Sequence, residues 1–346
     1  MSETDINQEV KQSQDVKQTQ DVKQSQEIKD KPSEMFFVDK TVPKESSKEK
    51  SKASSDTTNF IGKGANRHLD KSWNIKFTVG SELFKNIIEF IETVGYDTLM
   101  IFRKKEVSML IIDKMQTHAI SIKINRIEFI DYIVKDLKDD DDEKVVYIDT
   151  SIITDELSIN EKYPIDVYID TLELNRFYIV NAKEIVGRQL EALNTTDAME
   201  SIVNKNKSMQ NSIINMILGE NYQKVIVNQI PFANLIKSMT KKTSKDKDSL
   251  TIATLCLRKH ELDFVIEKDI QSTSVVLSGE DILVYPIRED EVRFNLEFFN
   301  KFGKLKLTYA VILYISGGMP LVLETKLGGG KVVIHYLIAP RVDEDN

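Results

Sequence analysis

Lysine side chains gather in two parts of the sequence, at spacings suited to contacts with phosphate groups. One group lies on or beside the polar face of a helix predicted over Pro231–Thr243, and its members are Lys237, Lys241 and Lys242. The other lies in and just after a short predicted helix, and its members are Lys301 and Lys304. Ammonium groups attract phosphate oxygens without distinguishing between bases, and salt weakens this attraction. Each lysine taken alone also fits an ordinary solvated face, so spacing leaves both interpretations open.

No residue pattern typical of catalysis or of metal binding occurs in the sequence. The histidines are scattered, without an HExxH motif or a Cys/His spacing, and they are His68, His118, His260 and His335. The glycines at 328–330 before Lys331 predict a hairpin turn, because a phosphate-binding loop would open a helix. The acidic run Asp139–Asp142 lacks the alternation and the glycine of a calcium loop. We therefore expect no catalytic residue, no metal and no other cofactor.

Composition narrows the class of protein. The chain has 346 residues, of which 41% are hydrophobic, and a formal net charge of −8, which predicts two domains of ordinary size. A single cysteine, Cys256, excludes an intrachain disulfide and is typical of a reducing compartment. No apolar stretch approaches the roughly 20 residues that span a bilayer, and the N-terminus lacks a secretory signal. We therefore expect an intracellular protein that is not secreted and has no membrane partner. Nucleic-acid binding by such an acidic chain would require a segregated basic face.

The chain is predicted to contain a tail and two similar domains. Residues 1–70 hold a six-residue repeat, seen in Asp15–Gln20 and Asp21–Gln26, and few hydrophobic residues, which predicts a disordered low-complexity tail. A strand, a helix and a meander of strands then occur twice, which predicts an N-terminal domain over 71–182 and a C-terminal domain over 222–346. Between them, 183–221 is interpreted as a connector or insertion of helix and loop.

The last elements of the first domain are the hardest to predict. Asp170–Val180 is interpreted as a second helix of that domain, and no further strands are identified before residue 222. In the second domain, the strand Ser272–Leu277 is the candidate edge for contacts between subunits.

The closing segment from Val292 to Val342 carries three motifs in a fixed order. They are Phe298-Phe299-Asn300-Lys301, Pro320-Leu321-Val322-Leu323-Glu324 and Ile338-Ala339-Pro340-Arg341. This order and spacing resemble the end of proliferating cell nuclear antigen (PCNA), the sliding clamp of eukaryotes and archaea. The stretch from Val107 to Ser121, with His118 after a turn, is also similar to the Met-Asp-Ser-Ser-His loop of that family, with a two-residue insertion. The resemblance covers residues 73–342 and is weak between 125 and 221.

The resemblance implies an α+β fold of two similar DNA-clamp domains, each with helices on an antiparallel sheet. Head-to-tail contacts would assemble such chains into a closed ring, with three subunits as the family expectation. The implied function is to encircle double-stranded DNA without sequence preference and to tether a DNA polymerase for processive replication, with no enzymatic activity. The implied partners are an ATP-dependent clamp loader, the polymerase, and replication and repair proteins with short docking motifs. The implied place of action is a site of DNA replication, in a nucleus or, given the Lys-, Ile- and Asn-rich composition, a viral factory.

Two sets of site residues follow from the resemblance. The DNA-binding residues of the channel helices would be Lys237, Lys241, Lys242, Lys301, Lys304, Lys85 and Arg176, of which Lys237 and Lys301 match the family positions most closely. The partner-peptide pocket would be formed by Ile112, His118, Ala119, Pro320, Leu321, Ile338, Ala339 and Pro340. Several of these apolar residues fit an ordinary sheet core equally well.

A second function remains open at the level of sequence. The chain could be a viral transcription or scaffolding factor that keeps the clamp fold without forming a ring. The unidentified interface strands favour this alternative, and so do the acidic residues of the first helix, Glu82, Glu89 and Glu92. Pairing of 183–221 as strand or packing as helix would distinguish the two functions.

Overall fold

The computed structural model describes most of the chain after residue 72. The described ranges are 73–95, 97–140, 142–151, 153–154, 164–171, 176–180, 185–189, 196–243, 251–268, 271–307 and 309–341. All of them belong to one unit, Thr58–Asn346. The tail predicted over 1–70 lies outside the described residues.

The first half of the described chain folds as a strand, a helix and eight further strands. Its main helix buries an apolar stripe that includes Phe84, Ile88 and Ile91. In order, the elements are β1 (Ile75–Val79), α3 (Ser81–Glu92), β2 (Asp97–Phe102), β3 (Glu106–Ile112), β4 (His118–Asn125), η1 (Arg126–Glu128), β5 (Asp131–Val134), β6 (Lys144–Asp149), β7 (Ile165–Asp170), β8 (Arg176–Val180) and β9 (Ile185–Gln189).

The second half repeats the order of strands and helices of the first half, and a long helix leads into it. This helix and the elements of the second half follow one another in chain order. They are α5 (Thr196–Leu218), β10 (Gln223–Val227), α6 (Gln229–Thr243), β11 (Ile252–Arg258), β12 (Glu261–Lys268), β13 (Gln271–Ser278), η2 (Gly279–Asp281), β14 (Ile282–Val284), β15 (Asp290–Asn295), α7 (Leu296–Phe302), β16 (Val311–Ile315), β17 (Leu321–Leu327), η3 (Gly328–Gly330) and β18 (Val332–Ile338).

The sheet topology is an internal duplication. The first half supplies the strand orders β5-β1-β7-β8-β9 and β4-β3-β2-β6, and the second half supplies β14-β10-β16-β17-β18 and β13-β12-β11-β15. Each strand of the second half therefore takes the position of the strand numbered nine lower. The halves join where β18 pairs antiparallel with β4, from Val332 opposite Ile124 to Ile338 opposite His118. This joint makes one nine-stranded sheet of strands from both halves.

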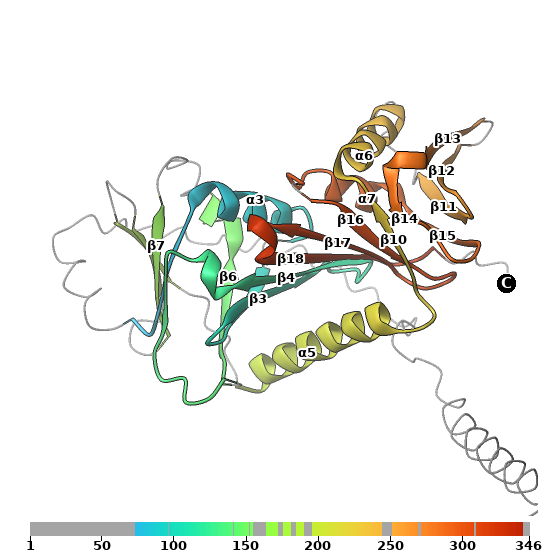
Figure 1. Ribbon diagram of the computed structural model, residues 1–346. Helices are drawn as coiled ribbons and strands as arrows, with labels where there is room; N and C mark the ends of the chain where they lie inside the picture. The colour runs from blue at the N-terminus through green and yellow to red at the C-terminus, as the bar shows by residue number, and fades with distance from the viewer. Residues whose placement is uncertain are drawn as a thin grey trace, which may run out of the picture. The chain divides into compact units, whose positions relative to one another are not determined.

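Helices cover both faces of the nine-stranded sheet, as Figure 1 shows: α3 and α7 lie on one side and α5 lies on the other. On the α3–α7 side, Phe90 meets Phe302 with ring centroids 5.9 Å apart, and Phe302 stacks on Tyr336 of β18. These rings belong to the main hydrophobic core. A separate, smaller cluster joins α5 to the opposite face of the sheet. No helix in the described ranges is long and apolar enough to span a membrane.

The structure corrects the prediction for the middle of the chain. The helix predicted over Asp170–Val180 is wrong, because this stretch ends β7 and forms β8, which pair antiparallel. Its aromatic and β-branched residues favour a strand once a partner is present, and this pairing overrides local helix propensity. The strands that were not identified from sequence exist as well, since β9 pairs with β8 within the segment assigned to the connector. The rest of that segment contains helix α5, as its composition predicted.

Candidate functional site

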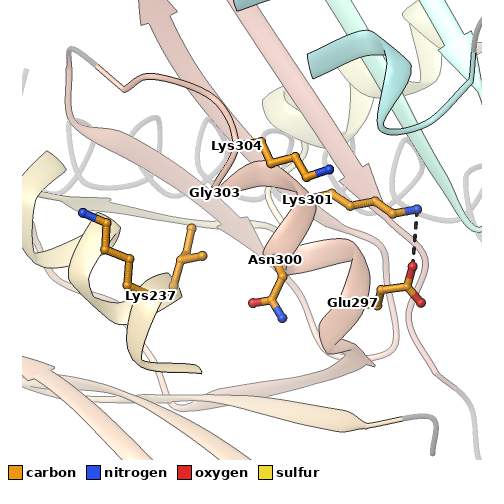
Figure 2. A pocket seen from close by; sticks show the side chains of 7 residues that line it. Lys237, Glu297, Asn300, Lys301, Gly303 and Lys304 are labelled. Carbon is orange, nitrogen blue, oxygen red and sulfur yellow. Dashed lines mark ion pairs between the residues drawn. The ribbon is translucent and has the colours of Figure 1, made fainter. Parts of the chain in front are cut away.

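Three of the lysines predicted to contact DNA lie around a hollow between α6 and α7. The hollow has a volume of about 550 Å³, and its lining includes Lys237, Glu297, Asn300, Lys301 and Lys304. Figure 2 shows Lys237 on α6, across the hollow from Lys301 and Lys304 on the α7 side. The structure therefore brings together Lys237 and Lys301, the two lysines that the resemblance favoured most as DNA contacts.

Local sequence explains the orientation of these helices. In α6, Phe232, Leu235, Ile236 and Met239 recur at helical spacing and are buried, which leaves Lys237 exposed. At the start of α7, the side chain of Asn295 accepts a hydrogen bond from the Glu297 backbone N–H at 2.9 Å. Leu296, Phe299 and Phe302 then point into the core, so the polar residues of α7 face the hollow.

The close approach of α6 and α7 depends on a glycine. A Cβ atom added to Gly303 would lie 2.4 Å from Cγ2 of Ile236, a distance at which the two atoms overlap. Only a residue without a side chain therefore allows the helices to approach at this point.

The lysines around the hollow differ in their partners. Lys301 Nζ lies 3.7 Å from a Glu297 carboxylate oxygen and 5.1 Å from the centre of the Phe298 ring. Lys237 and Lys304 are exposed, and neither forms an ion pair with any residue in the described ranges. Lys241 and Lys242 follow on the last turn of α6, but their side chains lie outside what the structure describes.

The two DNA-binding residues predicted in the first half lie in a different environment. Lys85 is on α3 and sits 3.9 Å from the Glu89 carboxylate one turn later. Arg176 is the first residue of β8, opposite Asp170 of β7, and therefore does not lie on a helix. The interpretation of Arg176 as part of a channel helix is wrong for the same reason as the predicted helix, namely cross-strand pairing. Glu82 adds a second exposed carboxylate to α3, so this helix is acidic.

Lys301 also contacts His118, the histidine predicted to line the partner pocket. The His118 ring is buried, stacks on Phe298 with centroids 4.2 Å apart, and has its Nε2 3.5 Å from Lys301 Nζ. Its Nδ1 lies 3.4 Å from a carboxylate oxygen of Asp113. Burial, and then the Lys301 ammonium, lower the pKa of His118 to about 4. A neutral ring can accept a hydrogen bond from Lys301 at Nε2.

The turn before His118 is organised by one carboxylate. Asp113 accepts hydrogen bonds from the backbone N–H of His118 at 2.8 Å and of Met115 at 3.0 Å. It also accepts one from the Thr117 hydroxyl at 2.9 Å. Gln116 has a positive φ of 58° in this turn. The loop that resembled the family's Met-Asp-Ser-Ser-His segment is therefore a fixed turn, and it orients His118 toward α7.

The residues predicted to form one pocket separate onto different parts of the sheet. Leu321 and Ile338 are fully buried in the main core, and His118 faces α7. Ile112 and Ala119 belong instead to the smaller cluster beneath α5. The last three residues lie at strand ends: Pro320 precedes β17, and Ala339 and Pro340 follow β18.

Sequence reasoning missed the residues that accompany Ala119 on the outer face, meaning the face of the nine-stranded sheet that α5 covers. They are Tyr314, Val322 and Leu337, which with Ala119 and Ile213 of α5 are the buried members of the smaller cluster. The signal was present in the cross-strand pairing, because residues directly opposite on neighbouring strands share a face. It could be used only once the strand register was known.

A buried polar group lies on the same outer face. The Tyr314 hydroxyl donates to a Glu324 carboxylate oxygen at 2.9 Å, and His335 Nε2 lies 3.2 Å from the same oxygen. Burial acts to raise the pKa of Glu324, but the hydrogen bonds from His335 and Tyr314 outweigh it, so this pKa lies below its ordinary value. In the described ranges, no group of three or more His, Cys, Asp or Glu side chains is placed to hold a metal ion.

Comparison with known proteins identifies the fold. No protein-family model matches the sequence, and no curated protein matches it. The chain is similar to PCNA of Archaeoglobus fulgidus bound to the C-terminal region of FEN-1, with 14% identity and a TM-score of 0.59 over 78% of this chain and 100% of that one. PCNA of Entamoeba histolytica gives 14% identity and a TM-score of 0.58 over 78% and 100%. PCNA of Thermococcus kodakaraensis gives 14% and 0.60 over 77% and 100%. The α+β, duplicated antiparallel architecture of this chain is therefore the fold of the PCNA sliding clamps.

Proposed function

We propose that this chain is a DNA sliding clamp whose copies join head to tail in a ring around duplex DNA. The observation that supports the proposal best is the joint between β18 and β4, because the described strands form one such joint although the topology is duplicated. The equivalent strands of the other pair, β9 and β13, both lie at sheet edges. A β9–β13 joint between two copies would repeat the geometry of the β18–β4 joint.

The exposed edge of the second half has the chemistry of an interface. Val276 on β13 is 45% exposed, and Ile230 at the start of α6 is 70% exposed. Beside them is a hollow whose lining includes Pro231, Val275 and Leu277. An unpaired apolar edge strand invites pairing with another chain. Head-to-tail contacts of this kind close into a ring when the rotation between copies permits it, and three copies is the number we propose.

In this proposal, the side of the sheets that carries α3, α6 and α7 faces the DNA. Lys237, Lys301 and Lys304 would contact phosphates without reading sequence, which allows the protein to slide. Because α3 is acidic, the second half would supply most of the attraction. The chain would catalyse nothing itself.

The proposed partners act on the outside of the ring at a site of DNA replication. The A. fulgidus clamp binds the C-terminal region of FEN-1, which supports short peptide motifs as a class of partner for this fold. We extend this to a polymerase, replication and repair proteins, and an ATP-dependent loader that opens the ring.

Molar mass in solution tests the ring directly. Light scattering across a concentration series should give about three times the chain mass of 39.7 kDa. Val276→Asp, which places a charge on the β13 edge, should shift the mass toward one chain. Leu283→Asp is the matched control, because Leu283 is 56% exposed but lies on β14. A monomer at every concentration would contradict the ring.

One observation favours a second candidate function, a clamp-fold transcription or scaffolding factor that does not close into a ring. The acidic α3 provides little attraction for DNA in the first half of the chain. The sequence analysis also favoured this alternative because the last strands of the first domain were not identified. That argument no longer applies, since β8 and β9 are those strands. The mass measurement distinguishes the two functions.

A further inference from the structure

The outer face of the nine-stranded sheet carries a row of side chains aligned by strand register. Tyr314 lies opposite Val322, Val322 opposite Leu337, Leu337 opposite Ala119, and Ala119 opposite Ile112. Four of the five are buried, and they form the sheet side of the smaller cluster. We infer that α5 is a displaceable cover of this row, where it competes with the amphipathic helix of a partner protein. The inference rests on the proposed clamp function and adds a regulation of its outer docking site.

The contacts of α5 follow the pattern of a helix bound in a groove. Ile213 is 2% exposed, and Met209, Met216 and Ile217 pack around it at spacings of four, three and four residues. These positions fall on one side of a helix, which is how amphipathic partner helices present their anchors. The adjacent Ile214 is 40% exposed. The row therefore accepts a helix with apolar anchors at i, i+4, i+7 and i+8, and this is the partner chemistry we propose.

The fit of α5 to the row is imperfect. Gln210 is only 9% exposed, yet its Nε2 has no hydrogen-bond partner among the residues that the structure describes. A buried amide donor without an acceptor opposes docking. A partner helix with an apolar residue at this position would avoid the penalty, and so would bind the same row more tightly than α5 does.

The connection of α5 to β10 keeps the helix close to the row. The turn after α5 is held by Tyr222, whose hydroxyl donates to the Pro320 carbonyl at 3.4 Å, and by Arg288, whose guanidinium donates to the Asn221 carbonyl at 2.6 Å. A tethered segment acts at an effective concentration on the order of millimolar. If α5 has an intrinsic dissociation constant of roughly 100 μM, tethering keeps it docked in about nine chains of ten and weakens a competitor about tenfold.

A peptide with the sequence of residues 205–221 tests the inference, used with the full chain and no DNA. Fluorescence anisotropy measures its affinity for the wild type, for Ile213→Asp, which removes the central anchor of α5, and for Ile214→Asp, the exposed neighbour. We expect the peptide to bind Ile213→Asp about tenfold more tightly than it binds the wild type or Ile214→Asp. Adding Leu337→Asp to Ile213→Asp should abolish this binding. Equal affinity for all single variants, or no binding to a folded Ile213→Asp chain, would overturn the inference.

Hydrogen exchange of the wild-type chain tests the inference without any substitution, and so does not depend on whether a variant folds. We expect the amides of α5 to exchange faster than those of α3 and β4. The helix would then open with a free energy lower than that of global unfolding. Exchange of α5 together with the global unfolding of the sheet would overturn the inference, because α5 would then be part of the core. Neither measurement depends on a ring or on DNA, so the docking inference can fail while the mass measurement succeeds, and the reverse.

Discussion

Acidification should destabilise the folded chain through His118, and substitution of this residue should remove the effect. Its pKa falls from the ordinary 6.5 to about 4 on folding, because the ring is buried and faces the Lys301 ammonium. As the pH falls below 6.5, the unfolded chain takes up a proton at this position and the folded chain does not. Stability from the neutral ring is therefore complete above pH 6.5 and is lost progressively as the pH approaches 4.

The size of the effect follows from the two pKa values. At about 1.4 kcal/mol per pH unit, the full difference amounts to roughly 3 kcal/mol. Between pH 7 and pH 5, proton linkage gives a loss of about 2 kcal/mol. The Asp113 carboxylate, 3.4 Å from Nδ1, acts to raise the pKa of His118, but its effect is smaller than those of burial and Lys301.

Urea unfolding at pH 7, 6 and 5 measures this loss against His118→Gln. Glutamine cannot be protonated in this range, and it keeps an acceptor for Lys301. The variant should lose about 2 kcal/mol less than the wild type between pH 7 and pH 5, whatever other groups titrate in both chains. Lys301→Met should reduce the wild-type loss, since the second cause of the lowered pKa is gone. Parallel pH profiles for the wild type and His118→Gln would refute the reasoning.

Three further predictions concern the hollow and the outer face. Lys237→Glu combined with Lys301→Glu should lower the slope of log affinity for duplex DNA against log salt by about 0.9 per lost phosphate contact, and should reduce polymerase processivity. Gly303→Ala should destabilise the chain by about 1–3 kcal/mol in urea unfolding, because the added carbon overlaps a methyl group of α6. Tyr314→Phe should raise the pKa of Glu324, measured by NMR titration, because it removes a hydrogen bond that favours the carboxylate.

The first two of these predictions each have a control within the chain, and the third has an outcome that would contradict it. Lys331→Glu changes an exposed lysine in the turn between β17 and β18, and should leave the salt slope unaltered if the hollow is the contact site. Gly95→Ala adds a carbon 3.6 Å from Ile111, an ordinary contact distance, and should cost far less than Gly303→Ala. A Glu324 pKa unmoved by Tyr314→Phe would mean that the hydrogen bond contributes nothing to it.

Local patterns predicted the elements that carry their own signal. The amphipathic spacing of Phe84, Ile87 and Ile91 located α3, and that of Phe232 and Met239 located α6. The closing segment from residue 292 onward was predicted from motifs whose order could be compared with a known family. In all these regions, each residue's environment is decided largely by neighbours within one or two turns of helix or one hairpin.

The middle of the chain could not be predicted this way, because its structure depends on distant partners. Strand β8 forms because β7 and β9 flank it, and a strand with no recognised partner resembles a helix in a short window. The position of α5 likewise depends on a sheet face assembled from β3, β4, β16, β17 and β18. No window of sequence contains this face.

The geometry of strand β4 explains why the residues predicted to form one partner pocket lie on two different faces of the sheet. Successive side chains of a strand point to opposite faces, so His118 contacts α7 while Ala119 contacts the α5 cluster. A motif that names both residues therefore describes two surfaces, and in the proposed clamp the surface beneath α5 would be the one that faces an outer partner. The same alternation has a physical consequence for the proposed clamp. Since Ala119 and Leu337 on the outer side adjoin His118 and Ile338 on the inner side, a shift of β4 caused by a docked helix would also move the acceptor of Lys301. Partner binding outside the ring would then alter one of the lysines proposed to contact DNA inside it.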